Sequence, residues 1–427
     1  MELEELYNRF LACGCVTTDS RHCPKGSMFI ALKGETFNGN AFAAQALAQG
    51  CRYAVVDEPE YAGENCILVD DCLQALQKLA NCHRRRLKTP VIGITGTNGK
   101  TTTKELVSAV LSRKYNTLFT QGNLNNHIGV PMTLLRLTPE HEMAVVEMGA
   151  NHPGEIKTLV HIAEPDYGLI TNVGKAHLLG FGSFEGVIRT KGELYDYLRE
   201  KGNATVFIQN ENTYLNNIAT GLRCVRYGQT PGLFVSGEVT DCSPFLAFRW
   251  TSEGASHEVQ THLIGAYNLD NALAAVAVGR YFKVPDTDIC EALAAYVPQN
   301  NRSELKETAS NRLIVDAYNA NPTSMHAALE NFRRMQAPHK MVILGDMKEL
   351  GSASSEEHQK VVDLLKACSF ERVMLVGPEF AKTCSAYEHY PDVGEVIETL
   401  KRDKPEGCTI LIKGSNSMKL SQLPQWL

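Results

Sequence analysis

The stretch GITGTNGKTTTKE, which begins at Gly93, limits the possible folds of this 427-residue chain more than any other segment. It follows a run typical of a buried strand, VIGIT, and opens a helical run, TTTKELVSAVLSRKY, so a glycine-rich loop joins a strand to a helix. In that setting backbone N–H groups face an anion, Lys100 reaches the β and γ phosphates, and the Thr101 hydroxyl can bind Mg²⁺. One departure is that Ile94 occupies the first glycine position of the strict motif. The context still predicts a phosphate-binding loop made of Gly96, Thr97, Asn98, Gly99, Lys100, Thr101 and Thr102.

Apolar runs alternate with helical sequence on both sides of this loop, and they predict an α/β fold of three domains. Residues 1–88 hold short apolar runs and one clear helix, which indicates a small N-terminal α/β domain. In residues 89–297, strand-like runs alternate with helices, as in a central P-loop ATPase domain with a mostly parallel sheet. Residues 298–427 contain four apolar runs that end in small or polar residues, which is typical of a C-terminal doubly wound, Rossmann-like domain.

The composition argues against several classes of protein. With 42 basic and 48 acidic residues the formal charge is −6, and no basic surface of the kind that binds nucleic acid is predicted. The one basic cluster, residues 83–88, is interpreted as a solvated helix end or an interdomain linker. The acidic N-terminus and the short apolar stretches predict a cytoplasmic protein without membrane insertion. The 13 cysteines are scattered, which favours reduced thiols over disulfides or structural zinc.

Glu147 and His177 each follow a predicted strand of the central domain. Taken alone, a strand-end acid often faces solvent, and a single histidine is more often structural than a ligand. However, the carboxyl ends of parallel strands lie at one edge of a sheet, so both side chains can converge on the phosphate loop. A carboxylate at that edge would suit a metal ion that accompanies the nucleotide.

Nine segments, taken in order, resemble the Mur ligase family. They are GITGTNGKTTTKE, GNLNNHIGVPMTLL, EMGANHPGEI, NVGKAHLLGFGS, TKGELYDYL, GAYNLDNALAA, DAYNANPTSM, LGDMKELG and IKGSNSMKL. Together with an N-terminal segment around Asp19, they extend to Lys419 and so cover nearly the whole chain. The resemblance implies an ATP-dependent amide ligase of peptidoglycan precursor synthesis. In that reaction the carboxylate of UDP-N-acetylmuramoyl-tripeptide takes the γ-phosphoryl group of ATP, and D-alanyl-D-alanine attacks the acyl phosphate.

The resemblance also implies roles for individual residues of the central domain. One Mg²⁺ would lie between Thr101, Glu147 and the β and γ phosphates, and a second would lie near His177 with help from a carbamylated Lys191. Lys100, His177 and Lys191 would then be the catalytic residues. Carbamylation turns an ammonium group into an anion, which explains how a lysine can serve a metal site. Without the resemblance, Lys191 would be interpreted as a surface residue.

Other positions match the family's nucleotide and substrate contacts. Asn268 and Asn271 match adenine contacts, although Asn268 could instead cap a helix. Arg302 and Asp316 of the third domain match phosphate and ribose contacts, so domain closure is expected, although an arginine can also form a surface ion pair. Candidates for the UDP moiety are Ser20, Arg21, Lys33, Asn38 and Gly39, with Phe29 weaker because it lies in an apolar run. Other substrate candidates are Asn125, Asn126, Asn319, Asn321, Lys413, Gly414 and Ser415.

A few positions depart from the family pattern, and other readings stay open. Leu179 stands where a glutamate is usual, NGN replaces D-G-H, and Val315 and Asn416 replace the usual Asp and Arg. These changes weaken claims about substrate contacts more than claims about the chemistry. The alternatives are a ligase that adds the third peptide residue, folylpolyglutamate synthase, a scaffold that has lost catalysis, and, from the loop alone, a kinase or motor ATPase. The third peptide residue stays open between diaminopimelate and lysine, and a monomer is predicted because three domains of one chain form the cleft.

Overall fold

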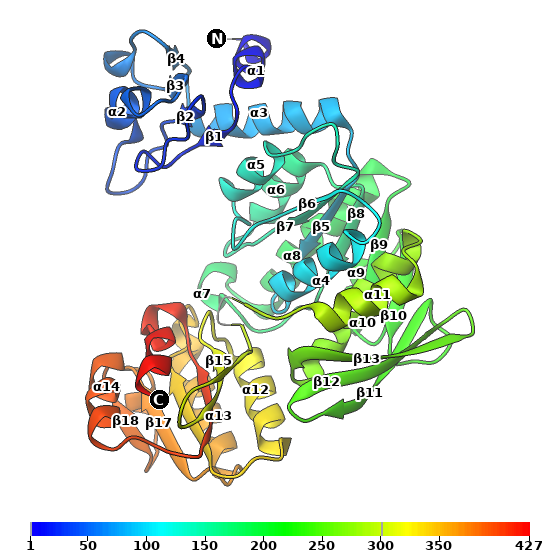
Figure 1. The fold of residues 1–427 in the computed structure, drawn as a ribbon, viewed down its shortest axis with the longest axis vertical. Helices are drawn as coiled ribbons and strands as arrows, with labels where there is room; N and C mark the ends of the chain where they lie inside the picture. Colours follow the sequence, from blue (N-terminus) through cyan, green and yellow to red (C-terminus); the bar gives the residue numbers. More distant parts are fainter. Residues whose placement is uncertain (1, 300–301) are drawn as a thin grey trace.

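The computed structural model describes residues 2–299 and 302–427, and it contains three β-sheets that follow one another along the chain (Figure 1). The N-terminal sheet and the C-terminal sheet lie at opposite ends of the molecule, and the largest sheet lies between them (Figure 1). Each sheet carries its own helices. The predicted three-domain α/β fold is therefore confirmed. Within the described residues, no helix is both long and apolar enough to cross a bilayer.

The N-terminal sheet has four parallel strands in the order β1-β2-β3-β4. The buried residues of β2 and β3 are the apolar runs seen in the sequence, and Phe29 of β2 is only 1% exposed. This burial places Phe29 in the core, as its apolar run favours. The strands are β1 (Val16–Thr17), β2 (Met28–Ile30), β3 (Tyr53–Val56) and β4 (Cys66–Leu68), and the helices are α1 (Leu3–Leu11), α2 (Ala43–Ala48) and α3 (Cys72–Leu87).

Helix α3 joins the first domain to the central one and contacts α5 and α6 (Figure 1). The basic cluster forms its C-terminal end, but the interpretation as a solvated end is wrong for two residues, since His83 and Arg84 are buried. Arg84 donates from Nε to the carbonyl of Ala163, the last residue of α6, at 2.9 Å and from Nη2 to Asp166 at 2.8 Å. Carbonyls at a helix C-terminus attract a cation, so these bonds fasten α3 to the central domain.

The central sheet has nine strands in the order β13-β12-β11-β10-β9-β8-β5-β7-β6. The pairs from β6 through β11 are parallel, as predicted, and β12 and β13 add antiparallel strands at one edge. The strands are β5 (Val91–Thr95), β6 (Thr117–Phe119), β7 (Met143–Glu147), β8 (Tyr167–Ile170), β9 (Thr205–Gln209), β10 (Arg223–Gly228), β11 (Val235–Cys242), β12 (Phe245–Ser252) and β13 (Ala255–Ile264). The helices are α4 (Lys100–Leu111), α5 (Gly129–Leu134), α6 (Glu155–Ala163), α7 (Leu178–Phe181), α8 (Phe184–Lys201), α9 (Thr213–Ile218), α10 (Leu269–Tyr281) and α11 (Asp286–Ala295).

Helix α4 begins directly after the phosphate loop, and its packing fixes the direction of that loop. Leu106, Val107, Val110 and Leu111 are fully buried, as the helical spacing predicts, and α4 contacts α10 and β7. Gly99 precedes the helix in a left-handed conformation with φ of 76°, which a residue with a Cβ adopts only with strain. The helix N-terminus therefore points toward the carboxyl edge of the central sheet.

The third sheet has the order β14-β15-β19-β16-β17-β18, and only β14 is antiparallel to its neighbour. The four apolar runs of the sequence form β15, β16, β17 and β19, which confirms the doubly wound arrangement. The strands are β14 (Glu304–Glu307), β15 (Arg312–Asp316), β16 (Lys340–Gly345), β17 (Arg372–Val376), β18 (Glu388–Tyr390) and β19 (Thr409–Lys413). The helices are α12 (Pro322–Arg334), α13 (Ser354–Lys366) and α14 (Val393–Arg402).

Candidate active site

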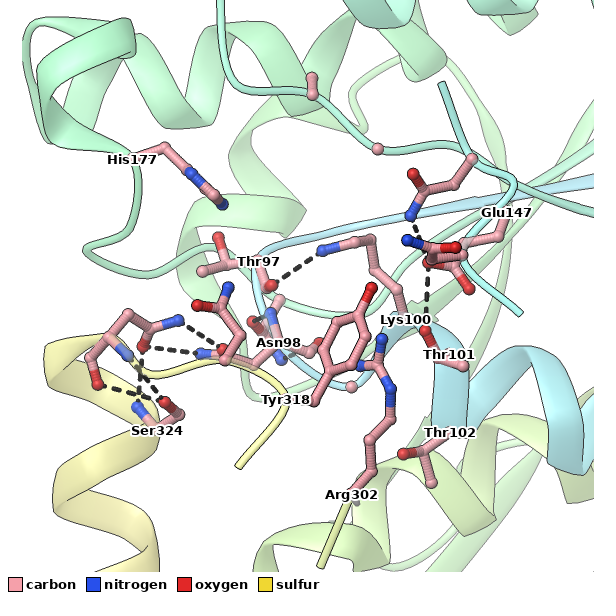
Figure 2. A pocket seen from close by; sticks show the side chains of 18 of the residues that line it. Thr97, Asn98, Lys100, Thr101, Thr102, Glu147, His177, Arg302, Tyr318 and Ser324 are labelled. Carbon is pink, nitrogen blue, oxygen red and sulfur yellow. Dashed lines mark hydrogen bonds between the residues drawn. The ribbon is translucent and has the colours of Figure 1, made fainter. Parts of the chain in front are cut away.

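A cavity of about 830 Å³ lies where the central domain meets the other two domains. Leu73 and Gln77 of α3 line its N-terminal side, and the phosphate loop lines its floor. The third domain contributes Arg302, Tyr318 and Lys413, among others. Figure 2 shows Arg302 and Tyr318 beside Lys100. All three domains of one chain therefore reach the same cavity.

The phosphate loop is held in shape by the segment that follows β8. The backbone N–H of Thr97 donates to the carbonyl of Asn172 at 2.9 Å, and the N–H of Asn98 donates to the side-chain oxygen of Asn172 at 3.0 Å. A Cβ on Gly96 would lie 2.1 Å from Oγ1 of Thr171, so only glycine fits that position. Asn172 is not among the residues predicted from the sequence, although it follows β8 just as Glu147 ends β7.

Lys100 lies over its own loop and is partly withdrawn from water. Its ammonium donates to the carbonyl oxygens of Gly96 and Thr97, both at 2.9 Å. Burial is the main cause that lowers the pKa of Lys100; with the opposing charge of Glu147 and the assisting charge of Arg302 included, the pKa is about 8. The side chain is therefore an anion-binding group whose charge depends on what occupies the cavity.

Glu147 ends β7 and is almost fully buried, with only 1% of its surface exposed. Its Oε1 accepts hydrogen bonds from the Thr101 hydroxyl at 3.2 Å and from the Asn125 amide at 2.8 Å. Its Oε2 is buried and has no hydrogen-bond partner among the described residues. A buried carboxylate oxygen without a partner, beside a hydroxyl group, is the donor set that Mg²⁺ accepts, so these residues fit the predicted ion.

His177 follows β8 and lies across the cavity from Glu147, with Lys100 between them in the view of Figure 2. Burial lowers the pKa of His177, the positive charges of Lys100 and Lys191 lower it further, and the Glu349 carboxylate opposes them. The imidazole is therefore neutral near pH 7, which is the form that binds a metal. Its Nδ1 faces the Glu349 carboxylate of the third domain.

Lys191 lies on α8 and is buried, contrary to the reading of an exposed lysine that the sequence alone favours. Its amine donates to the carbonyl of Ala150 at 3.2 Å, and it lies behind the residues that line the cavity. Burial holds the pKa of Lys191 well below its ordinary value, and the charge of Lys100 acts in the same direction. A neutral amine is the form that can take up carbon dioxide, so the environment of Lys191 fits carbamylation. In the described parts of the chain, no cluster of three or more His, Cys, Asp and Glu side chains is arranged to hold a metal.

The two predicted adenine residues line the same cavity as the phosphate loop and bind each other. The amide of Asn271 donates to Oδ1 of Asn268 at 2.8 Å, and the amide of Asn268 donates to the carbonyl of Ile264 at 2.8 Å. Asn268 makes no side-chain cap of α10, so the capping alternative is wrong. A second hollow of about 400 Å³ adjoins these residues, and Asn268, Tyr296 and Arg302 are part of its lining.

The third domain contributes several candidates to the cavity, and one of them contacts the phosphate loop. Asn321 caps α12 and donates from its amide to Oδ1 of Asn98 at 2.7 Å, so it touches the phosphate loop directly. The Arg302 guanidinium lies 3.7 Å from the centre of the ring of Tyr318, which is not among the residues predicted from the sequence. Lys413 lines the cavity and forms an ion pair with Asp316. The remaining cavity candidates are Asn125, Asn126 and Asn319, whereas Gly414 and Ser415 do not line it.

The UDP candidates of the first domain lie outside this cavity. The ammonium of Lys33 lies between the carboxylates of Asp57 and Glu58, at 2.9 Å from each. The Asn38 amide also donates to Glu58, at 2.8 Å. Arg21 is highly exposed and pairs only with its neighbour in the chain, Asp19, among the described ion pairs. Of the other two candidates, Ser20 is half-buried and Gly39 is buried.

Comparisons with known proteins cover all three domains. The family models described as "Mur ligase family, catalytic domain", "Mur ligase middle domain" and "Mur ligase, glutamate ligase domain" match residues 14–84, 94–279 and 301–416. A UDP-N-acetylmuramoyl-tripeptide--D-alanyl-D-alanine ligase from Escherichia coli is 37% identical, covering 98% of this chain and 94% of the relative. The structure of MurF from Acinetobacter baumannii has a TM-score of 0.87 at 31% identity, covering 99% of this chain and 97% of that chain. The structure of MurF ligase from Thermotoga maritima in complex with ADP has a TM-score of 0.86 at 25% identity, covering 98% and 97%.

Proposed function

This chain belongs to the Mur ligase family, and on that premise we propose that it is an ATP-dependent ligase that joins D-alanyl-D-alanine to UDP-N-acetylmuramoyl-tripeptide. The products are ADP, phosphate and a UDP-linked muramoyl-pentapeptide, a precursor of peptidoglycan. One observation carries the proposal. Glu147, whose Oε1 accepts from Thr101 and whose Oε2 has no partner among the described residues, lines the same cavity as Lys100 and Arg302, so charges of both signs face one space.

Positive charge is what this reaction needs first. A carboxylate and a triphosphate repel each other, and two unit charges 4 Å apart interact by about 4 kcal/mol at an effective dielectric near 20. Lys100 and Arg302 come from different domains and lie beside the same loop, so both can offset that repulsion. Mg²⁺ would be held by Thr101 and Glu147 and would add further positive charge at the phosphates. A second ion would be held near His177, with a carbamylated Lys191 supplying negative charge.

The proposed reaction has two displacements. A carboxylate oxygen of the tripeptide attacks the γ-phosphorus of ATP, and the bond between that phosphorus and the β,γ-bridging oxygen breaks. ADP leaves, and the tripeptide carries an acyl phosphate. The amine of D-alanyl-D-alanine then attacks the carbonyl carbon, a tetrahedral intermediate forms, phosphate leaves, and the nitrogen loses a proton. Lys100 and Arg302 hold the phosphates in line, and closure of the three domains excludes water that would hydrolyse the acyl phosphate.

The other contacts follow from the same proposal. Asn268 and Asn271 bind adenine through side-chain amides, and Asp316 contacts the ribose. The UDP moiety binds the first domain at Ser20, Arg21, Lys33, Asn38 and Gly39, so the muramoyl-peptide extends past α3 toward the phosphate loop. Leu73 and Gln77 of α3 lie on that path. Asn125, Asn126, Asn319, Asn321 and Lys413 contact the peptide substrates. We also propose that the enzyme acts as a monomer in the cytoplasm; the three domains of one chain that line the cavity support the monomer.

Phosphate release from ATP and Mg²⁺ tests the proposed function. The purified protein is supplied with UDP-N-acetylmuramoyl-tripeptide together with D-alanyl-D-alanine, with D-alanine, or with no acceptor. We expect release only with the dipeptide, and the pentapeptide product in the mass spectrum. Release without an acceptor, or none in any mixture, would contradict the proposal and favour a scaffold or a ligase for another substrate.

A further inference from the structure

The third domain contacts the loop that carries His177, residues 172–183, at two points. At the first point, the N–H of Leu179 donates to the carbonyl of Glu349 at 3.1 Å, while the Glu349 carboxylate faces Nδ1 of His177. The contact is close, because a Cβ on Gly351 would lie 3.3 Å from the Leu179 side chain. Glu349 therefore meets the loop with both its backbone and its side chain.

The second point is an ion pair between domains. Nζ of Lys175 lies 3.2 Å from Oε1 of Glu357 on α13. The Glu357 side chain is only 8% exposed and also accepts from Lys360 of its own helix at 3.0 Å. A shielded carboxylate makes a stronger ion pair than one on the open surface, because water screens it less.

Both residues at the first point have an unusual backbone. His177 has φ of 51° and Glu349 has φ of 64°, which is the left-handed region that non-glycine residues seldom occupy. Such a conformation costs energy and persists only where the surroundings hold it. Here the two strained residues face each other across the domain boundary. Contacts from each domain therefore help to hold the strained residue of the other domain.

We infer that Lys175 and Glu357 are positioning residues, and that they dock the third domain onto the loop so that His177 is held toward the cavity. The inference rests on the proposed function, because it assigns His177 a part in the reaction. The third domain also carries Arg302 and Lys413, which line the cavity. The ion pair therefore links the arrival of the third domain at the phosphates to the placement of His177.

A double-mutant cycle tests this role, with Lys175→Met, Glu357→Gln and the two combined. We expect each single variant to lower kcat for amide formation roughly tenfold, with little change in KM for ATP, because neither residue touches the phosphate loop. The double variant should be no slower than either single variant. Lys175→Arg should restore most of the activity because it keeps the charge.

Two controls separate positioning from general damage. Lys360→Met also removes a partner of Glu357 but leaves the interdomain contact, so its kcat should equal that of the wild type. Hydrogen exchange of the peptide that covers residues 172–183 should be faster in Lys175→Met and in Glu357→Gln than in Lys360→Met, with equal melting temperatures. Additive effects in the cycle, or unchanged exchange of the loop, would overturn the inference. A wild-type protein without ligase activity would instead overturn the proposed function.

Discussion

The phosphate-loop end of the molecule and the UDP-type segment of the first domain treat their charged side chains in different ways. At the loop, Oε2 of Glu147 is buried without a partner, and Lys100 rests on two loop carbonyls. In the first domain, Lys33 lies between two carboxylates of its own domain. A buried group with unused bonding capacity is costly unless something binds there, whereas a satisfied group needs no ligand. The comparison indicates that Glu147 depends on a bound partner, whereas Lys33 is already held in place by its own domain and would contribute less to ligand binding.

The largest effect should come from removing the carboxylate at the loop. Glu147→Gln keeps the shape of the side chain but removes its charge, so we expect kcat to fall by about 10³-fold. Phosphate release with both peptide substrates measures this. Glu140→Gln, on the exposed surface, is the matched control and should be unchanged. Near wild-type activity in Glu147→Gln would show that the reaction does not need the unpartnered carboxylate.

The next effect concerns the buried lysine of α8. On the proposed carbamylation, Lys191→Ala should lower kcat by about 10²-fold, because a negative charge near His177 would be lost. Added acetate should restore part of the activity of this variant and should leave the activity of the wild type unchanged. If the variant is as active as the wild type, Lys191 does not belong to the site. If it is inactive and acetate has no effect, the lysine is not needed as an anion.

The pH dependence of nucleotide affinity tests the state of Lys100. Its pKa is about 8 in the free protein, and bound phosphates favour the charged form and so raise that pKa. Below pH 8 the ammonium is charged before and after binding, so the affinity for ADP should be constant. Above pH 8 binding must restore a proton, and the affinity should fall by up to about tenfold per pH unit.

Titration calorimetry of ADP between pH 7 and 9.5, in two buffers of different ionisation enthalpy, measures both the affinity and the proton uptake. Lys100→Arg stays charged throughout this range, so its affinity should not depend on pH. A flat profile for the wild type would mean that Lys100 does not titrate in this range.

The smallest effects should separate two candidates of the first domain. Arg21 is highly exposed and uses only part of its donor capacity on Asp19, so Arg21→Met should raise KM for the UDP-linked substrate roughly tenfold. Lys33 already binds two carboxylates, so Lys33→Met should change KM by less than about threefold. Steady-state kinetics of both variants at saturating ATP measures the difference. A larger rise in KM for Lys33→Met than for Arg21→Met would contradict this prediction. It would show that the paired lysine contributes more to substrate binding than the exposed arginine.

The sequence predicts the fold best where strands are buried on both faces. The strands of the parallel sheets stand out as continuous apolar runs, because helices cover both faces of such a sheet. None of the predicted strands corresponds to β10, β11, β12 or β13, because no continuous apolar run marks them. In β12, buried and exposed residues largely alternate, as expected when one face of an antiparallel strand meets solvent, and no apolar run marks it.

Only part of the candidate site can be predicted from the sequence. The predictable part consists of residues that the sheet topology alone brings together. Lys100, Thr101 and Glu147 lie at strand ends or in the loop, so topology alone brings them to one edge. The burial of Lys191, the contact of Asn172 with the phosphate loop and the stacking of Tyr318 on Arg302 depend on packing between distant elements. Spacing along the chain carries no signal for such contacts, and the roles of the site residues stay predictions.

Helix α3 has 16 residues, which corresponds to about 24 Å at 1.5 Å per residue. Arg84 locks its far end to the central domain, while its first turns line the cavity. On the proposed function, the length of the helix sets the distance between the uridine site and the phosphate loop. A nucleotide-linked peptide one residue too short would be held by its uridine end with its carboxylate out of reach of ATP. Selection for substrate length would then reside in a rigid spacer that binds neither the base nor the phosphates.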